Sequence, residues 1–190
     1  LSSAASDVYK RQGIKRLAKF FYRHIVKNPI QSMLLLGIGV CLCWIYGRQI
    51  ILVYGYRASD IPVHMSWINE MSRGKIFAKG VYPFGFHCII YYLHAVFRFD
   101  TYVILCQFFF AQVIFMHLVL LAMLKQLCKT KYIPYIGTFV FLLGNFWSGQ
   151  TYSRFYATLP QEFGMIFVIP SIYFPVSYTH LRAHETGAYL

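Results

Sequence analysis

The chain has 190 residues, of which 58% are hydrophobic and 19% aromatic, and its formal net charge is +12. This composition excludes an ordinary soluble domain and predicts an all-α integral membrane protein, a polytopic helix bundle. The charge does not predict a nucleic-acid partner, because the basic residues cluster beside apolar runs, where they act as orientation signals.

The two ends of the chain differ from the rest. Residues 1–12 and 176–190 are polar, lack periodicity and join abruptly to strongly apolar sequence. Both resemble translated adaptor sequence, and the alternative is an ordinary disordered terminus at each end. We therefore expect them to be foreign to the fold, and the natural protein to extend beyond residues 13–175.

Apolar periodicity predicts the helices in chain order. Residues 13–28 carry apolar side chains on one face and basic ones mostly off it, which indicates a basic interfacial helix. A first membrane span is expected over residues 29–54. Residues 102–124 contain no charged side chain and as a helix would reach about 35 Å, enough to cross a bilayer. A third span is expected over residues 133–147, and a fourth begins at residues 163–175.

The short loops set the expected orientation. The basic N-terminal helix and the lysine-rich loop at residues 125–132 should both be cytoplasmic. Residues 55–101 and 148–162 then face outward, and so do the acidic residues that lie between positions 13 and 175. These are Asp60, Glu70, Asp100 and Glu162.

The apolar stretch at residues 84–97 is a possible further crossing. It has only 14 residues, two of them histidines, which is short for a span. Counting it as a crossing would also place the lysine-rich loop outside, against the positive-inside rule. We therefore expect a helix that lies in, or dips into, the outer interface.

Asp60 and His64 are four residues apart, just beyond the first span. If Pro62 lies in the first turn of a helix, their side chains share one face with Trp67 and Met71. Such a pair can hold a base or bind a metal. The alternative is that the Asp60 carboxylate merely caps the helix by accepting from backbone N–H groups.

Two further groups of polar residues lie in the outer loops. Tyr82 and His87 flank an aromatic turn at Pro83 and are candidates for the same outer cavity as Asp60, or else members of an aromatic belt at headgroup level. Arg154 and Glu162 are the charges of the second outer loop. They are suited to contact a phosphate and a metal ion or acceptor. Alternatively, they only anchor the helix that follows.

The order of these parts resembles the amino-terminal region of the GT-C class of membrane glycosyltransferases, such as protein O-mannosyltransferases and lipid A aminoarabinose transferases. The likeness covers about residues 30–175. It comprises Asp60 soon after the first span, the Pro83 turn into an interfacial helix, a long second span, and Ser153-Arg154 with Glu162 before the next span.

The resemblance implies transfer of a sugar from a polyprenyl-phosphate donor to an acceptor on the outer face of a bacterial plasma membrane. Asp60 would be the general base or the carboxylate that orients the acceptor, because a glycosyl phosphate already carries its leaving group and the acceptor must lose a proton. Arg154 would bind phosphate, and Glu162 with His64 would hold a divalent cation where one is used. No other cofactor is implied. A GT-C donor groove needs further spans, so residues 13–175 alone are expected to be inactive.

A non-catalytic polytopic protein, either a transporter of a lipid-linked sugar or an assembly partner, is the alternative. Transporters usually carry charged or polar groups within their spans, often at broken helices. The expected spans are nearly free of ionisable residues, which favours the enzyme.

Overall fold

The structure is a computed structural model that describes residues 19, 22, 28–53, 55, 58, 60–77, 84–147 and 154–187, the last of these from position 176 onward by its backbone alone. Within this part of the chain all regular secondary structure is helical. The expected interfacial helix over residues 13–28 falls almost wholly outside it. In chain order the elements are α2 (Pro29–Leu42), the π-helix η2 (Cys43–Gly47), α3 (Arg48–Leu52), α4 (Ile61–Ser72), α5 (Gly85–Phe97), α6 (Thr101–Leu127), α7 (Ile133–Trp147) and α9 (Pro160–Gly187).

Two helical stretches are long and apolar enough to cross a membrane. The first, Pro29–Leu52, joins α2, η2 and α3 without interruption, and the second is α6. Both coincide with expected spans. Helix α7 has the expected bounds, but its 15 residues reach only about 22 Å, which is less than a hydrocarbon core of about 30 Å.

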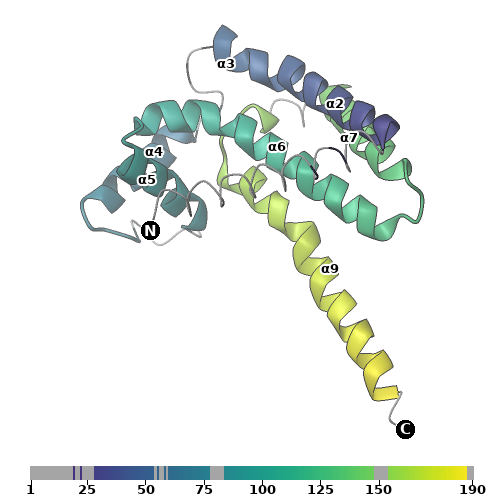
Figure 1. Cartoon of the computed structure of the whole chain (residues 1–190). Coiled ribbons are helices and arrows are strands. Elements are labelled where there is room, and N and C mark those ends of the chain that lie inside the picture. The colour runs from purple at the N-terminus through teal and green to yellow at the C-terminus, as the bar shows by residue number, and fades with distance from the viewer. Residues whose placement is uncertain are drawn as a thin grey trace, which may run out of the picture.

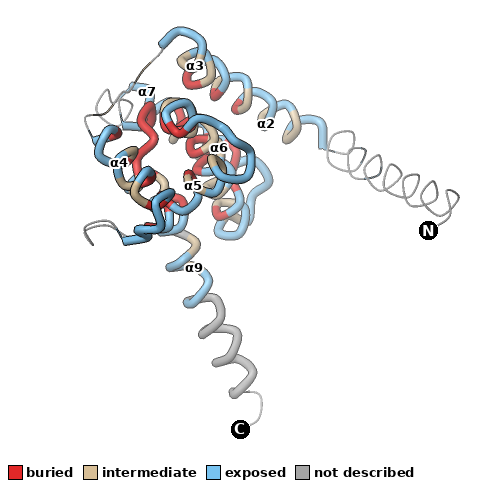
Figure 2. The backbone as a smooth tube through the Cα atoms, turned by 90° about the vertical axis from the view of Figure 1, so that its left-hand side faces the viewer, coloured by how far each residue is buried: buried red, intermediate tan, exposed pale blue. Residues whose placement is uncertain are grey.

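Helix α6 is the central element of the bundle (Figure 1). Its N-terminus is capped by Asp100, whose carboxylate accepts from the backbone N–H groups of Tyr102 and Val103 at 2.8 and 3.2 Å. Along its length α6 packs against two hydrophobic clusters. One joins its middle to α2, η2 and α7, and the other joins its first turns to α4 and α5. Buried residues therefore gather at the centre of the molecule, while much of α2 is exposed (Figure 2).

A buried turn at residues 155–159 links the two clusters. All five of its residues are buried, and after Phe155 the segment is not helical. The Tyr156 hydroxyl donates to the backbone carbonyl of Ile45 in η2 at 3.1 Å, and the Thr158 hydroxyl accepts from the backbone N–H of Phe109 at 2.9 Å. The turn thereby ties the π-helix and the middle of α6 to the start of α9.

Helix α9 begins at Pro160, three residues before the expected start, and continues to Gly187. Its first turns pack against α5 and α6, where Phe163 contacts the rings of Phe86 and Phe108 at 5.7 and 6.1 Å between centroids. The C-terminal half extends away from the other helices (Figure 1). That half contains residues 176–187, which from their sequence we expected to be foreign to the fold.

The outward sides of the long helices are strongly apolar. On α2, Met33 and Leu36 are 71% and 68% exposed, and Trp44 in η2 is 69% exposed. Large apolar side chains also face outward along α7 and the first half of α9, among them Val140 and Phe167. Water-soluble monomers rarely expose contiguous apolar surface of this extent. The fold therefore presents the kind of surface that a bilayer covers.

The acidic residues gather at one end of α6. Asp100 caps its N-terminus. Asp60 directly precedes α4, whose Ile61 packs with Ile104 and Leu105 in the first turns of α6. Glu70 lines a cavity with Tyr102, and Glu162 directly precedes Phe163, which packs on α5 and α6 at the same end.

The opposite end of α6 carries lysines. Lys125 lies over the ring of Tyr135 in α7 at 4.7 Å, and Lys129 and Lys131 are exposed in the following connection. Basic residues also occur at the acidic end, for example Arg48 and Arg73. The asymmetry therefore concerns the acidic residues, which the topology predicted from the sequence also places on one face of the membrane.

Candidate functional site

Asp60 lies at the exposed start of α4. Pro62 occupies the first turn, as the sequence predicts, because its fixed φ suits that position and no helical N–H is needed there. The Asp60 backbone carbonyl accepts from the N–H groups of Val63 and His64 at 3.0 and 3.1 Å, but its carboxylate makes no capping hydrogen bond to the helix. The capping alternative therefore describes Asp100 and not Asp60.

His64 and His87 meet at the interface between α4 and α5. Their facing nitrogens, Nδ1 of His64 and Nε2 of His87, are 3.0 Å apart, so one donates to the other. The side chains are 3% and 0% exposed, and the rings of Trp67, Phe84 and Phe86 surround them. The pair locks α4 onto α5 within an aromatic enclosure.

This enclosure favours the neutral form of both rings. Burial lowers the pKa of His64, and the nearby charge of Asp60 partly opposes that effect. Burial and the proximity of His64 together lower the pKa of His87 to about 4. The His87 Nδ1 atom has no hydrogen-bond partner in the described part of the chain, so nothing at that atom stabilises a second proton.

This geometry predicts a pH-dependent stability. An unfolded histidine takes up a proton below about pH 6.5, whereas folded His87 does so only near pH 4. The stabilisation is therefore complete above pH 6.5 and is lost as the pH falls towards 4. Between pH 7 and 5 the free energy of unfolding should fall by about 2 kcal/mol from this residue. Thermal unfolding of the intact protein in detergent at several pH values measures this decrease.

Two variants show whether the His64–His87 pair, and not another histidine, causes this pH dependence. His87→Phe should flatten the pH dependence, while His94→Gln, at a partly buried histidine outside the aromatic enclosure, should keep it. An unchanged slope in His87→Phe contradicts the prediction.

Arg154 and Glu162 also meet. The Arg154 Nε donates to Oε1 of Glu162, and its Nη2 donates to the side chain of Gln161 at 2.8 Å. The Arg154 side chain is 52% exposed, whereas that of Glu162 is 8% exposed. Glu162 Oε2 is buried and, within the described residues, has no partner. Among the described residues no contact is made by the third guanidinium nitrogen, Nη1, which could therefore meet a phosphate oxygen.

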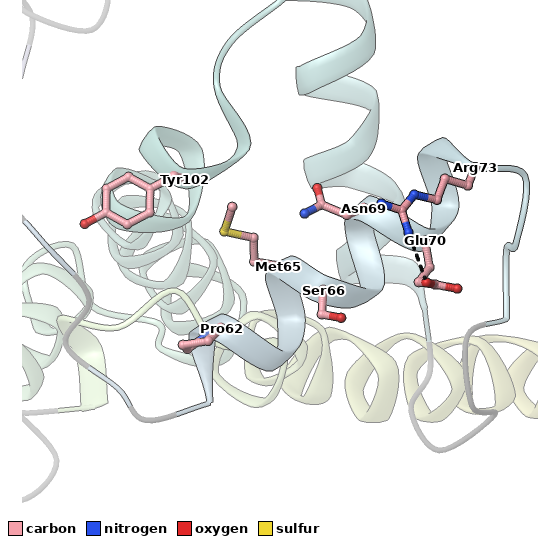
Figure 3. Close-up of a pocket in the computed structure, with 7 residues that line it drawn as sticks. All are labelled: Pro62, Met65, Ser66, Asn69, Glu70, Arg73 and Tyr102. Atoms are coloured by element: carbon pink, nitrogen blue, oxygen red, sulfur yellow. Dashed lines mark ion pairs between the residues drawn. The ribbon is translucent and has the colours of Figure 1, made fainter.

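Two open cavities flank α4. The first, of about 460 Å³, is lined by Met65, Ser66, Asn69 and Glu70 of α4 together with Tyr102 of α6, and Figure 3 shows these side chains around it. The second, of about 800 Å³, lies against Trp67 and Phe77. Both are lined by Pro62, two residues after Asp60.

Ion pairs of Glu70 border both cavities. Glu70 pairs with Arg73 at 3.6 Å, as drawn in Figure 3, and with Lys75 at 3.2 Å. Sequence reasoning missed this polar rim. The signal was the helical spacing of Ser66, Asn69, Glu70 and Arg73, which places them along one side of α4.

The structure thus brings the predicted site residues together in part. His64 pairs with His87, and Arg154 pairs with Glu162, while Tyr82 lies outside the described residues. His87 is fully buried between α4 and α5, which does not agree with the predicted role of its side chain in substrate binding. No group of three or more His, Cys, Asp or Glu side chains forms a metal site within the described part, and the predicted cation ligands Glu162 and His64 have other partners.

Comparison of the chain with protein-family models, with curated proteins and with solved structures finds no match. Its function has to be inferred from its own residues and their geometry.

Proposed function

We propose that the chain is the N-terminal part of a polytopic membrane glycosyltransferase that works on the outer face of a bacterial plasma membrane. The observation that supports this best is the placement of Asp60. It is exposed at the acidic end of α6, at the start of a helix flanked by two cavities. In the proposed topology the N-terminus and the lysine-bearing end of α6 are cytoplasmic.

The proposed reaction needs a base and a site for phosphate. The donor is a sugar linked to a polyprenyl phosphate. The acceptor hydroxyl oxygen forms a bond to the anomeric carbon of that sugar while the bond from this carbon to the phosphate oxygen breaks, and the phosphate leaves with the electron pair. Asp60 takes the hydroxyl proton. The Nη1 group of Arg154 is suited to the phosphate charge.

The His64–His87 pair supports Asp60 without touching substrate. His64 follows Asp60 by one helical turn and is held rigidly against α5. The first turn of α4, and with it the Asp60 backbone, is thereby fixed relative to α6. Holding the base in one place is what proton abstraction in a positioned complex requires.

One observation favours the alternative, a non-catalytic transporter of a lipid-linked sugar. Gln112, near the middle of α6, is 2% exposed, and neither of its amide atoms has a partner among the described residues. Polar groups buried within spans often mark a substrate path. His117 of α6 is also buried, and its Nε2 has no partner among the described residues. Because no Lys, Arg, Asp or Glu lies between residues 102 and 124, we place this function second.

Two assays on the intact protein, with all of its spans, distinguish the functions. With a radiolabelled polyprenyl-phosphate sugar in proteoliposomes, the enzyme releases label to a water-soluble or protein acceptor on the outer face. A transporter instead moves the intact labelled lipid between leaflets without cleaving it. Translocation without cleavage overturns the glycosyltransferase proposal.

Cysteine labelling tests the orientation. Ser72, at the end of α4, is exposed, and Cys128, just after α6, is half-buried. In intact cells a membrane-impermeant maleimide should label the cysteine introduced by Ser72→Cys, while Cys128 should be labelled only after permeabilisation. The other cysteines of the sequence, Cys41, Cys43, Cys88 and Cys106, are replaced by alanine for this measurement. Labelling of Cys128 from outside contradicts the proposed topology.

A further inference from the structure

The last residue of α5 and the connection to α6, together residues 97–100, form a fixed turn with aromatic side chains, called here the aromatic turn. Arg98 has a φ of 57°, and it is the one residue other than glycine with positive φ in the described part of the chain. On one side of it His94 Nδ1 donates to the carbonyl of Phe99 at 2.7 Å, and on the other Asp100 caps α6. The backbone is therefore held at both ends.

The two aromatic rings of this turn point outward. Phe97 and Phe99 stack on each other with centroids 5.8 Å apart and an interplanar angle of 17°. They are nevertheless 55% and 56% exposed. Stacking covers only one face of each ring, so a large apolar surface remains for some other partner.

An apolar strip on α5 continues to the aromatic turn. Ile89, Tyr92 and Val96 are exposed, and their spacing of three and four residues places them on one side of the helix. The opposite side, with Phe86 and Ile90, is buried against the protein. Helix α5 is thus apolar on both sides, as is expected of a helix between protein and lipid.

The aromatic turn also lies where a bilayer surface would be. Phe99 is two residues before Thr101, the first residue of the membrane-length helix α6. Aromatic side chains at such a boundary sit between headgroups and acyl chains. Arg98, between the two rings, is exposed and has no ion pair or hydrogen bond among the described residues. Its planar fork matches the oxygens of a phosphate.

We propose that the aromatic turn and the apolar strip of α5 bind the outer leaflet. Phe97 and Phe99 enter the upper acyl region, and Arg98 binds a lipid headgroup phosphate. This inference rests on the proposed membrane topology. Because α5 holds α4 through the His64–His87 pair, the contact fixes Asp60 at a set height above the bilayer, where the phosphate of a lipid-linked donor lies.

Fluorescence quenching tests the depth of the turn. The native Trp44, Trp67 and Trp147 are replaced by phenylalanine, Phe99→Trp is introduced, and the intact protein is placed in nanodiscs of phosphatidylglycerol brominated in the upper acyl chain. We expect quenching of at least about two-fold. Phe77→Trp is the matched control, because Phe77 is an exposed aromatic residue beyond α4 and outside the strip, and it should be quenched much less.

Equal quenching of the two variants, or none in Phe99→Trp, overturns the lipid contact. If the cysteine of Ser72→Cys is still labelled from outside in that case, the topology stands and only the lipid contact fails. A second set of variants tests whether Arg98 binds the lipid headgroup. Adding Arg98→Gln to Phe99→Trp should abolish the difference in quenching between brominated phosphatidylglycerol and brominated phosphatidylcholine, and Arg98→Lys should keep part of it. A difference that persists in Arg98→Gln overturns the role of Arg98.

Discussion

Asp60→Asn in the intact protein should lower sugar transfer by about 10²- to 10⁴-fold, the usual contribution of a positioned general base. The amide has nearly the shape of the carboxylate but does not accept the acceptor's proton at neutral pH. The loss should appear in kcat, with donor binding largely retained, because the proton moves only in the chemical step. Transfer of label from a polyprenyl-phosphate sugar in proteoliposomes measures it.

Asp100→Asn is the matched control for this variant. Asp100 caps α6, and asparagine caps helices about as well as aspartate, so transfer should be unchanged. Asp60→Asn should also melt at nearly the wild-type temperature, since the Asp60 carboxylate does not cap α4. Full transfer by a correctly inserted Asp60→Asn protein removes Asp60 from the mechanism.

Arg154→Met should lower the free energy of unfolding by about 3 kcal/mol, because it leaves the Glu162 carboxylate buried without its cation. The half-exposed position of Arg154 keeps the effect at the lower end of the range for buried pairs. The double variant Arg154→Met with Glu162→Leu should recover most of the loss, since it removes both charges. Denaturant titration in mixed micelles measures all of these variants.

The ion pair of Glu70 with Arg73 serves as the control for that experiment. Arg73 is 73% exposed at its side chain, and Arg73→Met should cost less than about 1 kcal/mol. Similar costs for Arg154→Met and Arg73→Met would mean that the Arg154–Glu162 pair is an ordinary surface contact.

Helix positions could be predicted from the sequence to a large extent. The bounds of α7 match the expectation at residues 133–147, and α6 extends it by one residue at the start and three at the end. Long apolar runs determine such bounds directly, because each residue's hydropathy contributes independently of tertiary contacts. Pro62 likewise predicted the start of α4, since proline lacks the backbone N–H that the helix interior needs and is favoured in the first turn.

The candidate site could be predicted less well from the sequence than the helices could. His64 and His87 are 23 residues apart, and their contact depends on how α4 and α5 rotate against each other, which no local pattern encodes. The same holds for Glu162, whose burial near the start of α9 depends on tertiary packing. Each of the predicted metal ligands has another partner, His87 for His64 and Arg154 for Glu162.

The hydrogen bonds of Tyr156 and Thr158 impose an order on biogenesis. In the proposed membrane protein, α2 and the first half of α6 can leave the ribosome before residues 155–159 are made, so the Ile45 carbonyl and the middle of α6 first meet the translocon without these partners. The early helices can enter the membrane singly, but their final arrangement has to wait for the later segment. Assembly intermediates that stall before this point would expose polar backbone to membrane chaperones and proteases, which makes the turn a natural checkpoint for quality control.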